Sequence, residues 1–159
     1  MRKFLFPIYE YIFANSFYFY FLESRTNMQN MVYLAQEMGV PMGNYGFSWF
    51  GNHIYSQKLH EDIYGLQWTD VRGDISSLST DNQIALLRLK NALEVPANSP
   101  YSIEQWCTCL ASIRYLRQSV LPRSSSDNKV LSELLKRNPL FTDDASNKEA
   151  IAREKILLA

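Results

Sequence analysis

Helix-start signals recur through the middle of this 159-residue sequence, and they constrain its fold more than any other feature. A Ser or Thr is followed three residues later by Gln at Thr26–Gln29, Thr80–Gln83 and Ser102–Gln105. In such a capping box, the hydroxyl and the amide each satisfy an exposed backbone group of a helix's first turn. Each pair precedes apolar residues at helical spacing, and a Gly or Pro closes each run. We therefore expect three helices here.

The three expected helices differ in how their apolar residues are arranged. The first has one stripe, made of Met28, Met31, Val32, Ala35 and Met38, and the third has another, made of Trp106, Leu110, Ile113, Leu116 and Val120. The second is apolar over much of its circumference, which predicts a central position in the fold. Its apolar residues are Ile84, Leu86, Leu87, Leu89 and Leu93. Two further helices are expected over 127–138 and 143–159.

The region from 40 to 75 differs from the helical remainder. Its first part, VPMGNYGFSWFGNHIYS, is punctuated by glycine and rich in aromatic residues, which is typical of a turn and a short extended piece. Ser56 can then cap a helix that has Leu59, Ile63 and Leu66 on one side.

These patterns predict a mainly α fold. We expect one compact multi-helix domain over 1–159, with at most a short hairpin or extended piece around 40–75. A helix-turn-helix-like arrangement is one form that such a domain can take. Its parts are an aromatic N-terminal helical segment (1–25), a middle block (26–66) and a helical remainder (80–159).

The N-terminal segment is dense in aromatic residues, above all from Tyr11 to Phe21. Pro7, Glu10, Asn15 and Ser16 interrupt it, which argues against a signal peptide or a bilayer span. We therefore expect no membrane partner and a helix packed in the fold. The aromatic residues exceed what one helix face needs, so we expect some, Tyr18 and Tyr20 among them, to stay exposed for a partner or a second copy of the chain.

Charge gives one local signal. Sixteen basic residues balance sixteen acidic ones, so no overall field attracts nucleic acid or acidic membranes. Basic residues nevertheless outnumber acidic ones between 114 and 137, where they are Arg114, Arg117, Arg123, Lys129, Lys136 and Arg137. This run fits either the solvated faces of two helices or a surface that contacts phosphate in a salt-dependent way.

No recognised catalytic or cofactor motif occurs in the sequence. His53 and His60 lack metal spacing, and Cys107 and Cys109 diverge around a helix, so we expect no metal and no cofactor. A reduced, cytoplasmic compartment suits the two thiols. An enzyme built on Cys107, on His53 or on His60 with Asp62 remains an open alternative.

Residues 24–66, SRTNMQNMVYLAQEMGVPMGNYGFSWFGNHIYSQKLHEDIYGL, resemble the YwgA-like proteins and the related Panacea-domain, SocA-like antitoxins. The family pattern is a RTxLQKLxYL helix, a FxWYxYGPYS turn and an xxLxxDLxxL helix. The matching residues are Arg25, Thr26, Met28, Gln29, Tyr33 and Leu34; Phe47, Trp49, Phe50, Tyr55 and Ser56; and Leu59, Asp62 and Ile63. The family's Lys is Asn30 here, and the turn lacks its proline.

The resemblance implies a helical, non-enzymatic module that acts as an antitoxin or proteolytic adaptor by binding a partner protein, often from a mobile or prophage-borne cassette. We therefore expect a regulatory protein whose partner is a toxin or a protease system, with Phe47, Trp49, Phe50 and Tyr55 as further anchors beside Tyr18 and Tyr20. Two alternatives stay open: a nucleic-acid-binding regulator that uses the 114–137 region, and an enzyme without a recognisable signature.

Overall fold

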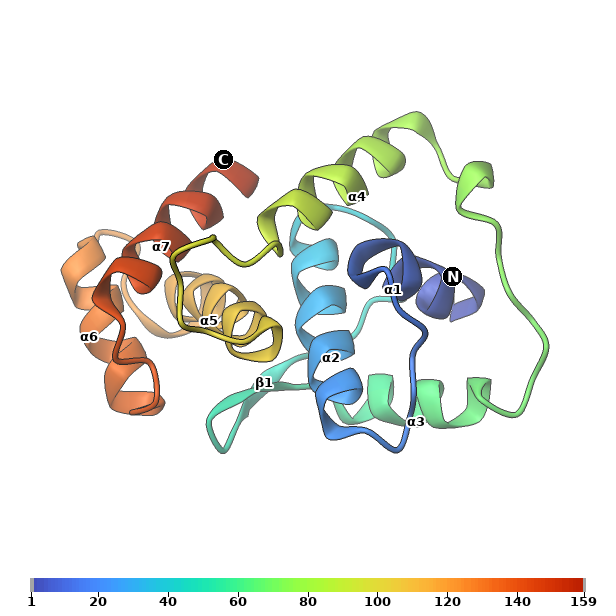
Figure 1. The fold of residues 1–159 in the computed structure, drawn as a ribbon, viewed down its shortest axis with the longest axis horizontal. Helices are drawn as coiled ribbons and strands as arrows, with labels where there is room; N and C mark the ends of the chain where they lie inside the picture. The colour runs from blue at the N-terminus through green and yellow to red at the C-terminus, as the bar shows by residue number, and fades with distance from the viewer. Residues whose placement is uncertain (1, 159) are drawn as a thin grey trace.

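Two helices, α2 (Leu22–Glu37) and α5 (Ile103–Tyr115), form the centre of the fold (Figure 1). The computed structural model describes residues 2–158. Every position of α2 from Thr26 to Ala35 is buried, which is unusual because most helices keep one face in water. The reason is that α1, α3, α4, α5 and β2 all pack against α2.

The remaining elements surround this pair. On one side of α2 lie α1 and α3, α4 crosses above, and α6 and α7 cover the far side of α5 (Figure 1). Their bounds are η1 (Arg2–Phe4), α1 (Leu5–Phe13), α3 (Gln57–Leu66), η2 (Ile75–Ser77), α4 (Thr80–Ala92), η3 (Leu116–Val120), α6 (Asp127–Arg137) and α7 (Asp144–Leu157). Strands β1 (Ser48–Phe50) and β2 (His53–Tyr55) form an antiparallel hairpin in which Trp49 pairs with Ile54.

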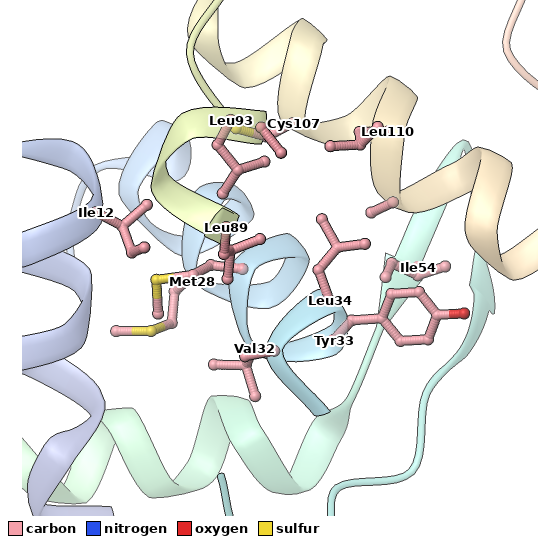
Figure 2. Packing of buried hydrophobic residues seen from close by; sticks show 14 of the residues in the cluster. Ile12, Met28, Val32, Tyr33, Leu34, Ile54, Leu89, Leu93, Cys107 and Leu110 are labelled. Carbon is pink, nitrogen blue, oxygen red and sulfur yellow. The ribbon is translucent and has the colours of Figure 1, made fainter. Parts of the chain in front are cut away.

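One hydrophobic core joins these elements. Figure 2 shows Ile12 of α1, Leu89 of α4 and Leu110 of α5 converging on Met28 and its neighbours in α2. Deeper in α5, the fully buried Trp106 ring donates its indole N–H to the carbonyl of Ala92, 3.0 Å away. The fold is mainly α with a short hairpin, as the sequence predicts.

The three predicted capping boxes have three different outcomes. The box at Ser102–Gln105 is present, with both hydrogen bonds made. The second helix is capped one residue earlier than predicted, because Ser79 rather than Thr80 accepts from the backbone N–H of Asn82. The box predicted at Thr26–Gln29 does not form, because α2 begins at Leu22 and Thr26 therefore lies inside the helix.

Gln29 shows why the predicted cap at Thr26 fails. Its amide does not turn back to a helix start; it donates to the carbonyl of Ser56 (3.0 Å) and accepts from the N–H of Ser56 (2.8 Å). The capping-box rule assigns the Gln29 side chain to a helix start at Thr26, but in the fold this side chain makes a tertiary contact with Ser56. The end of α2 follows the local rule, since Gly39 has φ +87° and Val40 N–H bonds the carbonyl of Ala35.

Three other sequence expectations need correction. The N-terminal segment is not helical throughout, because α1 ends at Phe13 and Ala14 is left-handed, with φ 53°. The helix α4 is not central: its Ile84 and Leu87 are about half exposed, because α2 and α5 already fill the centre. Finally, α5 passes into the π-helical turn η3, which rotates Val120 to the surface.

The helices α4 and α7 cap each other's C-terminal ends. Arg88 of α4 donates to the carbonyls of Ile156 and Leu157, and Arg153 of α7 donates to those of Ala92 and Glu94. Carbonyls at a helix end lack partners within the helix and carry partial negative charge, so a guanidinium there satisfies both needs. This exchange fixes α7 against α4 across the top of α5.

Glu154 holds the opposite side of α7. Its side chain is 2% exposed; it accepts from Arg117 Nε at 2.7 Å, and a carboxylate oxygen lies 3.5 Å from Arg114 Nη1. Arg114 also bonds Glu37 of α2, and Arg117 also bonds Asp127 of α6. One buried carboxylate therefore connects α7, through two arginines, to the helices on either side.

Replacing this carboxylate should destabilise the fold. Glu154→Ala leaves two half-buried guanidiniums without their shared partner, and we expect a loss of about 3 kcal/mol in the free energy of unfolding measured in urea. The matched control is Lys148→Gln, which removes an exposed ion pair with Asp144 and should change the same quantity by less than about 0.5 kcal/mol. Equal effects of the two variants would contradict the role given to Glu154.

Candidate partner-binding surface

Aromatic rings from three separate parts of the chain meet in one continuous surface strip. The rings form a chain of neighbouring pairs. The distance between ring centroids is 6.2 Å for Trp68 and Tyr64, 5.3 Å for Tyr64 and Phe19, 5.4 Å for Phe19 and His60, 6.1 Å for His60 and Tyr55, and 5.5 Å for Tyr55 and Phe50. Tyr20 adds to it through a 5.6 Å contact with Phe19. We refer to these residues as the aromatic strip: Phe19, Tyr20, Phe50, Tyr55, His60, Tyr64 and Trp68.

Much of the strip faces solvent. The exposed fraction is 74% for Tyr20, 68% for Trp68 and 66% for Phe50. Tyr18 and Phe21, whose rings lie 5.5 Å apart, extend the exposed aromatic area beside Tyr20. Single apolar residues at a surface are ordinary, but a contiguous group of this kind marks an interaction surface in many proteins.

Two glutamines of α2 position the segment that carries Phe50 and Tyr55 of the strip. Gln29 brackets the backbone of Ser56, and one heptad later Gln36 brackets Tyr45 by donating to its carbonyl (3.0 Å) and accepting from its N–H (2.6 Å). The hairpin lies between these two attachment points. Ser56 then caps α3 by accepting from Leu59 N–H, so the direction of α3 follows from the same contact.

The loop from 14 to 21 is fixed to the same surface by Arg25. Its guanidinium lies 5.6 Å from the Phe19 ring centroid and donates to the Phe19 carbonyl at 2.6 Å. The Phe19 ring then contacts the rings of both His60 and Tyr64 of α3. Beside it is a cavity of about 350 Å³ whose lining includes Phe17, Tyr18, Tyr20 and Arg72.

The six predicted anchors divide between two faces. Phe50 and Tyr55 belong to the strip, together with Tyr20, and Tyr18 lies beside it. Phe47 and Trp49 lie on the other face of the hairpin, because side chains alternate along a strand. Phe47 packs on Tyr33, and the Trp49 ring contacts Tyr115 and the Arg137 guanidinium, so both are half-buried supports. Partner binding by any of the six stays a prediction.

Sequence reasoning missed Phe19, Tyr64 and Trp68, although a signal for two of them is present. His60, Tyr64 and Trp68 recur every four residues, which places His60 and Tyr64 on one side of α3, with Trp68 in the turn that follows the helix. This side is adjacent to the one that carries the buried Leu59 and Ile63. No local pattern points to Phe19, because its place depends on the loop folding back onto α3.

The predicted basic surface is largely used within the chain. Arg114 and Arg117 bond Glu154, and Arg137 bonds Glu133 at 2.9 Å while lying over Trp49. Arg123, Lys129 and Lys136 are exposed. Nucleic-acid binding by this region stays a prediction, for which three of the six residues are available in this conformation.

The residues of the enzyme alternative are not brought together. Cys107 and Cys109 are buried in α5, and burial raises the pKa of both thiols, which opposes the thiolate form that a nucleophile needs. His53 lies in β2 and His60 in the strip. Within residues 2–158, no three His, Cys, Asp or Glu side chains form a group that could hold a metal ion.

Comparisons with known proteins add no relative. Searches against models of protein families, curated proteins and solved structures each found no match. The resemblance of residues 24–66 to the YwgA-like and Panacea-domain proteins therefore stays a prediction. None of the helices within residues 2–158 has the length and apolarity that crossing a bilayer requires.

Asp62 fixes the inner side of α3. Its carboxylate is 6% exposed, accepts from the Tyr45 hydroxyl at 2.7 Å and lies 3.1 Å from Lys58 Nζ. Burial acts to raise the pKa of Asp62, but the hydrogen bonds from Tyr45 and Lys58 outweigh it and hold the pKa below its usual value. The ionised form is therefore the one that stabilises the fold.

This predicts a pH-dependent effect of Tyr45→Phe. At pH 7 the variant should lose about 1.5 kcal/mol in free energy of unfolding, since a hydrogen bond to a charged group is removed. A carboxyl with a lowered pKa contributes stability above its unfolded-state pKa and loses it as pH falls through its folded-state pKa. The difference from the parent protein should therefore shrink at acidic pH, below about 4. A difference that stays constant from pH 7 to pH 3 in urea titrations would contradict it.

Proposed function

We propose that the chain is a non-catalytic regulatory protein that binds another protein through the aromatic strip. The observation that carries this proposal is the continuity of the strip. Each ring contacts the next one in space, although the rings come from the 14–21 loop, the hairpin and the region of α3, and much of their surface stays exposed. Aromatic residues dominate the energetics of protein interfaces because they offer large, rigid contact areas at low entropic cost.

The strip has further properties that suit a partner surface. Its rings are supported from beneath by the Gln29 and Gln36 brackets and by Arg25, so they are ordered before any partner binds. Preorganised side chains lose less entropy on association. The polar atoms within it, such as the hydroxyls of Tyr20, Tyr55 and Tyr64, provide hydrogen-bonding groups at the edge of an apolar contact.

The resemblance of residues 24–66 to the YwgA-like and Panacea-domain proteins suggests which regulatory role such binding would serve. An antitoxin-like or adaptor-like protein acts by covering the active surface of a toxin or by delivering a partner to a protease, and neither task needs a catalytic group. We place this activity in the cytoplasm, where the free thiols Cys107 and Cys109 persist in reduced form.

Paired variants of the strip test the proposal. The chain is co-expressed with the products of its flanking genes, and the affinity for any product that co-purifies is measured by calorimetry. We expect Phe50→Ala combined with Trp68→Ala to weaken that affinity at least about 30-fold, as the loss of two interface anchors should. Helical circular dichroism should stay unchanged, because both rings are exposed in the free chain.

The matched control is Ile84→Ala. Ile84 is 52% exposed on α4, which lies across α2 from α3 (Figure 1), so its truncation should leave the affinity unchanged. A homodimer formed through the strip would appear instead as self-association that the double variant abolishes. If the chain binds no flanking product and stays monomeric, or if the double variant binds as the parent does, the proposal is wrong.

A further inference from the structure

A second, chemically different cavity lies at the start of α5. It has a volume of about 240 Å³ and lies where four parts of the chain meet: the start of α2, the hairpin turn, the first turns of α5 and the segment after α6. Its lining residues are Leu22, Thr26, Asn52, His53, Glu104, Gln105, Thr108, Asn138, Leu140 and Phe141. We refer to it as the Glu104 cavity.

The walls of this cavity are held by internal hydrogen bonds. Thr108 accepts from Asn30 Nδ2 at 3.0 Å, and Asn138 donates to the carbonyl of Asn52 at 3.2 Å. Gln105 is held by the capping box with Ser102. One of these contacts joins α2 to α5 and another joins the hairpin turn to the segment after α6, so opposite walls are held together and the cavity is a preformed feature.

Glu104 is the only lining residue with a full formal charge, and although it lies in the first turn of α5, where the helix dipole favours a carboxylate, no side chain in the described part of the chain forms an ion pair with it. Among residues 2–158, no basic side chain forms an ion pair with it and no donor bonds its carboxylate. Burial, and secondarily repulsion from Glu23, raises the pKa of Glu104. A partly buried carboxylate without a partner is unfavourable in a structural role and common where a ligand supplies the missing charge.

The other polar residues of the cavity carry both donors and acceptors, since Asn52, Gln105 and Asn138 have amide groups and Thr26 and Thr108 have hydroxyls. His53 Nδ1 lies 2.8 Å from the carbonyl of Ile54. A carbonyl can only accept, so Nδ1 carries a proton and donates it to this carbonyl. One layer behind Thr108, the Oδ1 atom of the buried Asn30 has no hydrogen-bond partner. The Glu104 carboxylate is therefore the group of this site that favours a cationic ligand.

We propose that the Glu104 cavity binds a primary ammonium group carried on a short apolar stem. The ammonium supplies three donors and a positive charge for Glu104 and for neighbouring amide and hydroxyl oxygens, while Leu22, Leu140 and Phe141 provide apolar contacts for the stem. The volume lies below the usual range for drug-sized ligands, about 300–1,000 Å³, so only a small amine or a single lysine side chain fits. This proposal does not depend on partner binding by the aromatic strip.

Nuclear magnetic resonance titration of the ¹⁵N-labelled chain tests it, with n-butylammonium as the probe at pH 7. We expect saturable shifts of amides around Glu104, His53 and Asn138, with a Kd on the order of 10 mM for so small a ligand. Butyrate, which has the opposite charge, and n-butanol, which has none, should each bind at least about tenfold more weakly. Glu104→Gln keeps the side-chain volume and should weaken butylammonium binding at least about tenfold.

The control variant is Glu61→Gln, which removes an exposed carboxylate of α3 that does not line the cavity and should leave binding unchanged. Nα-acetyl-lysine amide distinguishes the source of the ammonium. Tighter binding of this compound than of butylammonium assigns the site to a lysine of another protein, and its exclusion assigns the site to a free amine. Absence of saturable shifts with both probes, or equal binding by Glu104→Gln and the parent chain, would overturn the proposal.

Discussion

Two glutamine amides on α2, one buried and one partly buried, determine where the surface of this protein presents its aromatic residues. Gln29 and Gln36 each bracket the backbone of one distant residue, Ser56 and Tyr45, with a donor and an acceptor at once. The segment between those residues contains the hairpin, and the residue that Gln29 brackets is the cap of α3. A buried amide must satisfy both of its polar atoms, so these contacts define position and register together.

The burial of α2 makes such contacts possible. Because every residue from Thr26 to Ala35 is enclosed, polar side chains on this helix reach other elements and not water. Asn30 is an example, since it bonds Thr108 of α5 across the most extensive helix contact of the fold.

The two sides of the molecule are chemically different. On the side of α7, the arginines are paired with carboxylates and helix ends, which uses their charge to join α4, α5, α6 and α7. On the side of α3, rings stack at the surface with their outer faces exposed. Between them, the Glu104 cavity holds a carboxylate that the chain itself does not balance. The first side uses its charges within the fold, and the other two features are the proposed binding sites.

Local rules in the sequence determined a large part of the fold. The apolar spacing and the caps at Ser56 and Ser102 specify α3 and α5, Gly39 ends α2, and the glycine-punctuated aromatic stretch becomes the hairpin. These signals act within a few residues, so they can be seen without the fold. Even the four-residue recurrence from His60 to Trp68 is visible in the sequence once the α3 register is known.

Only the tertiary structure decided which helices became central, where α2 begins and which rings form the strip. The apolar circumference of α4 predicts a central helix, yet Ile84 and Leu87 are exposed because α2 and α5 already occupy the core. The Gln29 side chain bonds the backbone of Ser56 and does not form a cap with Thr26. Phe19 contacts α3 because Arg25 holds the loop that carries it. The sequence determined the local helices and turns through contacts between near neighbours, whereas the candidate surface depends on contacts between residues far apart in the chain.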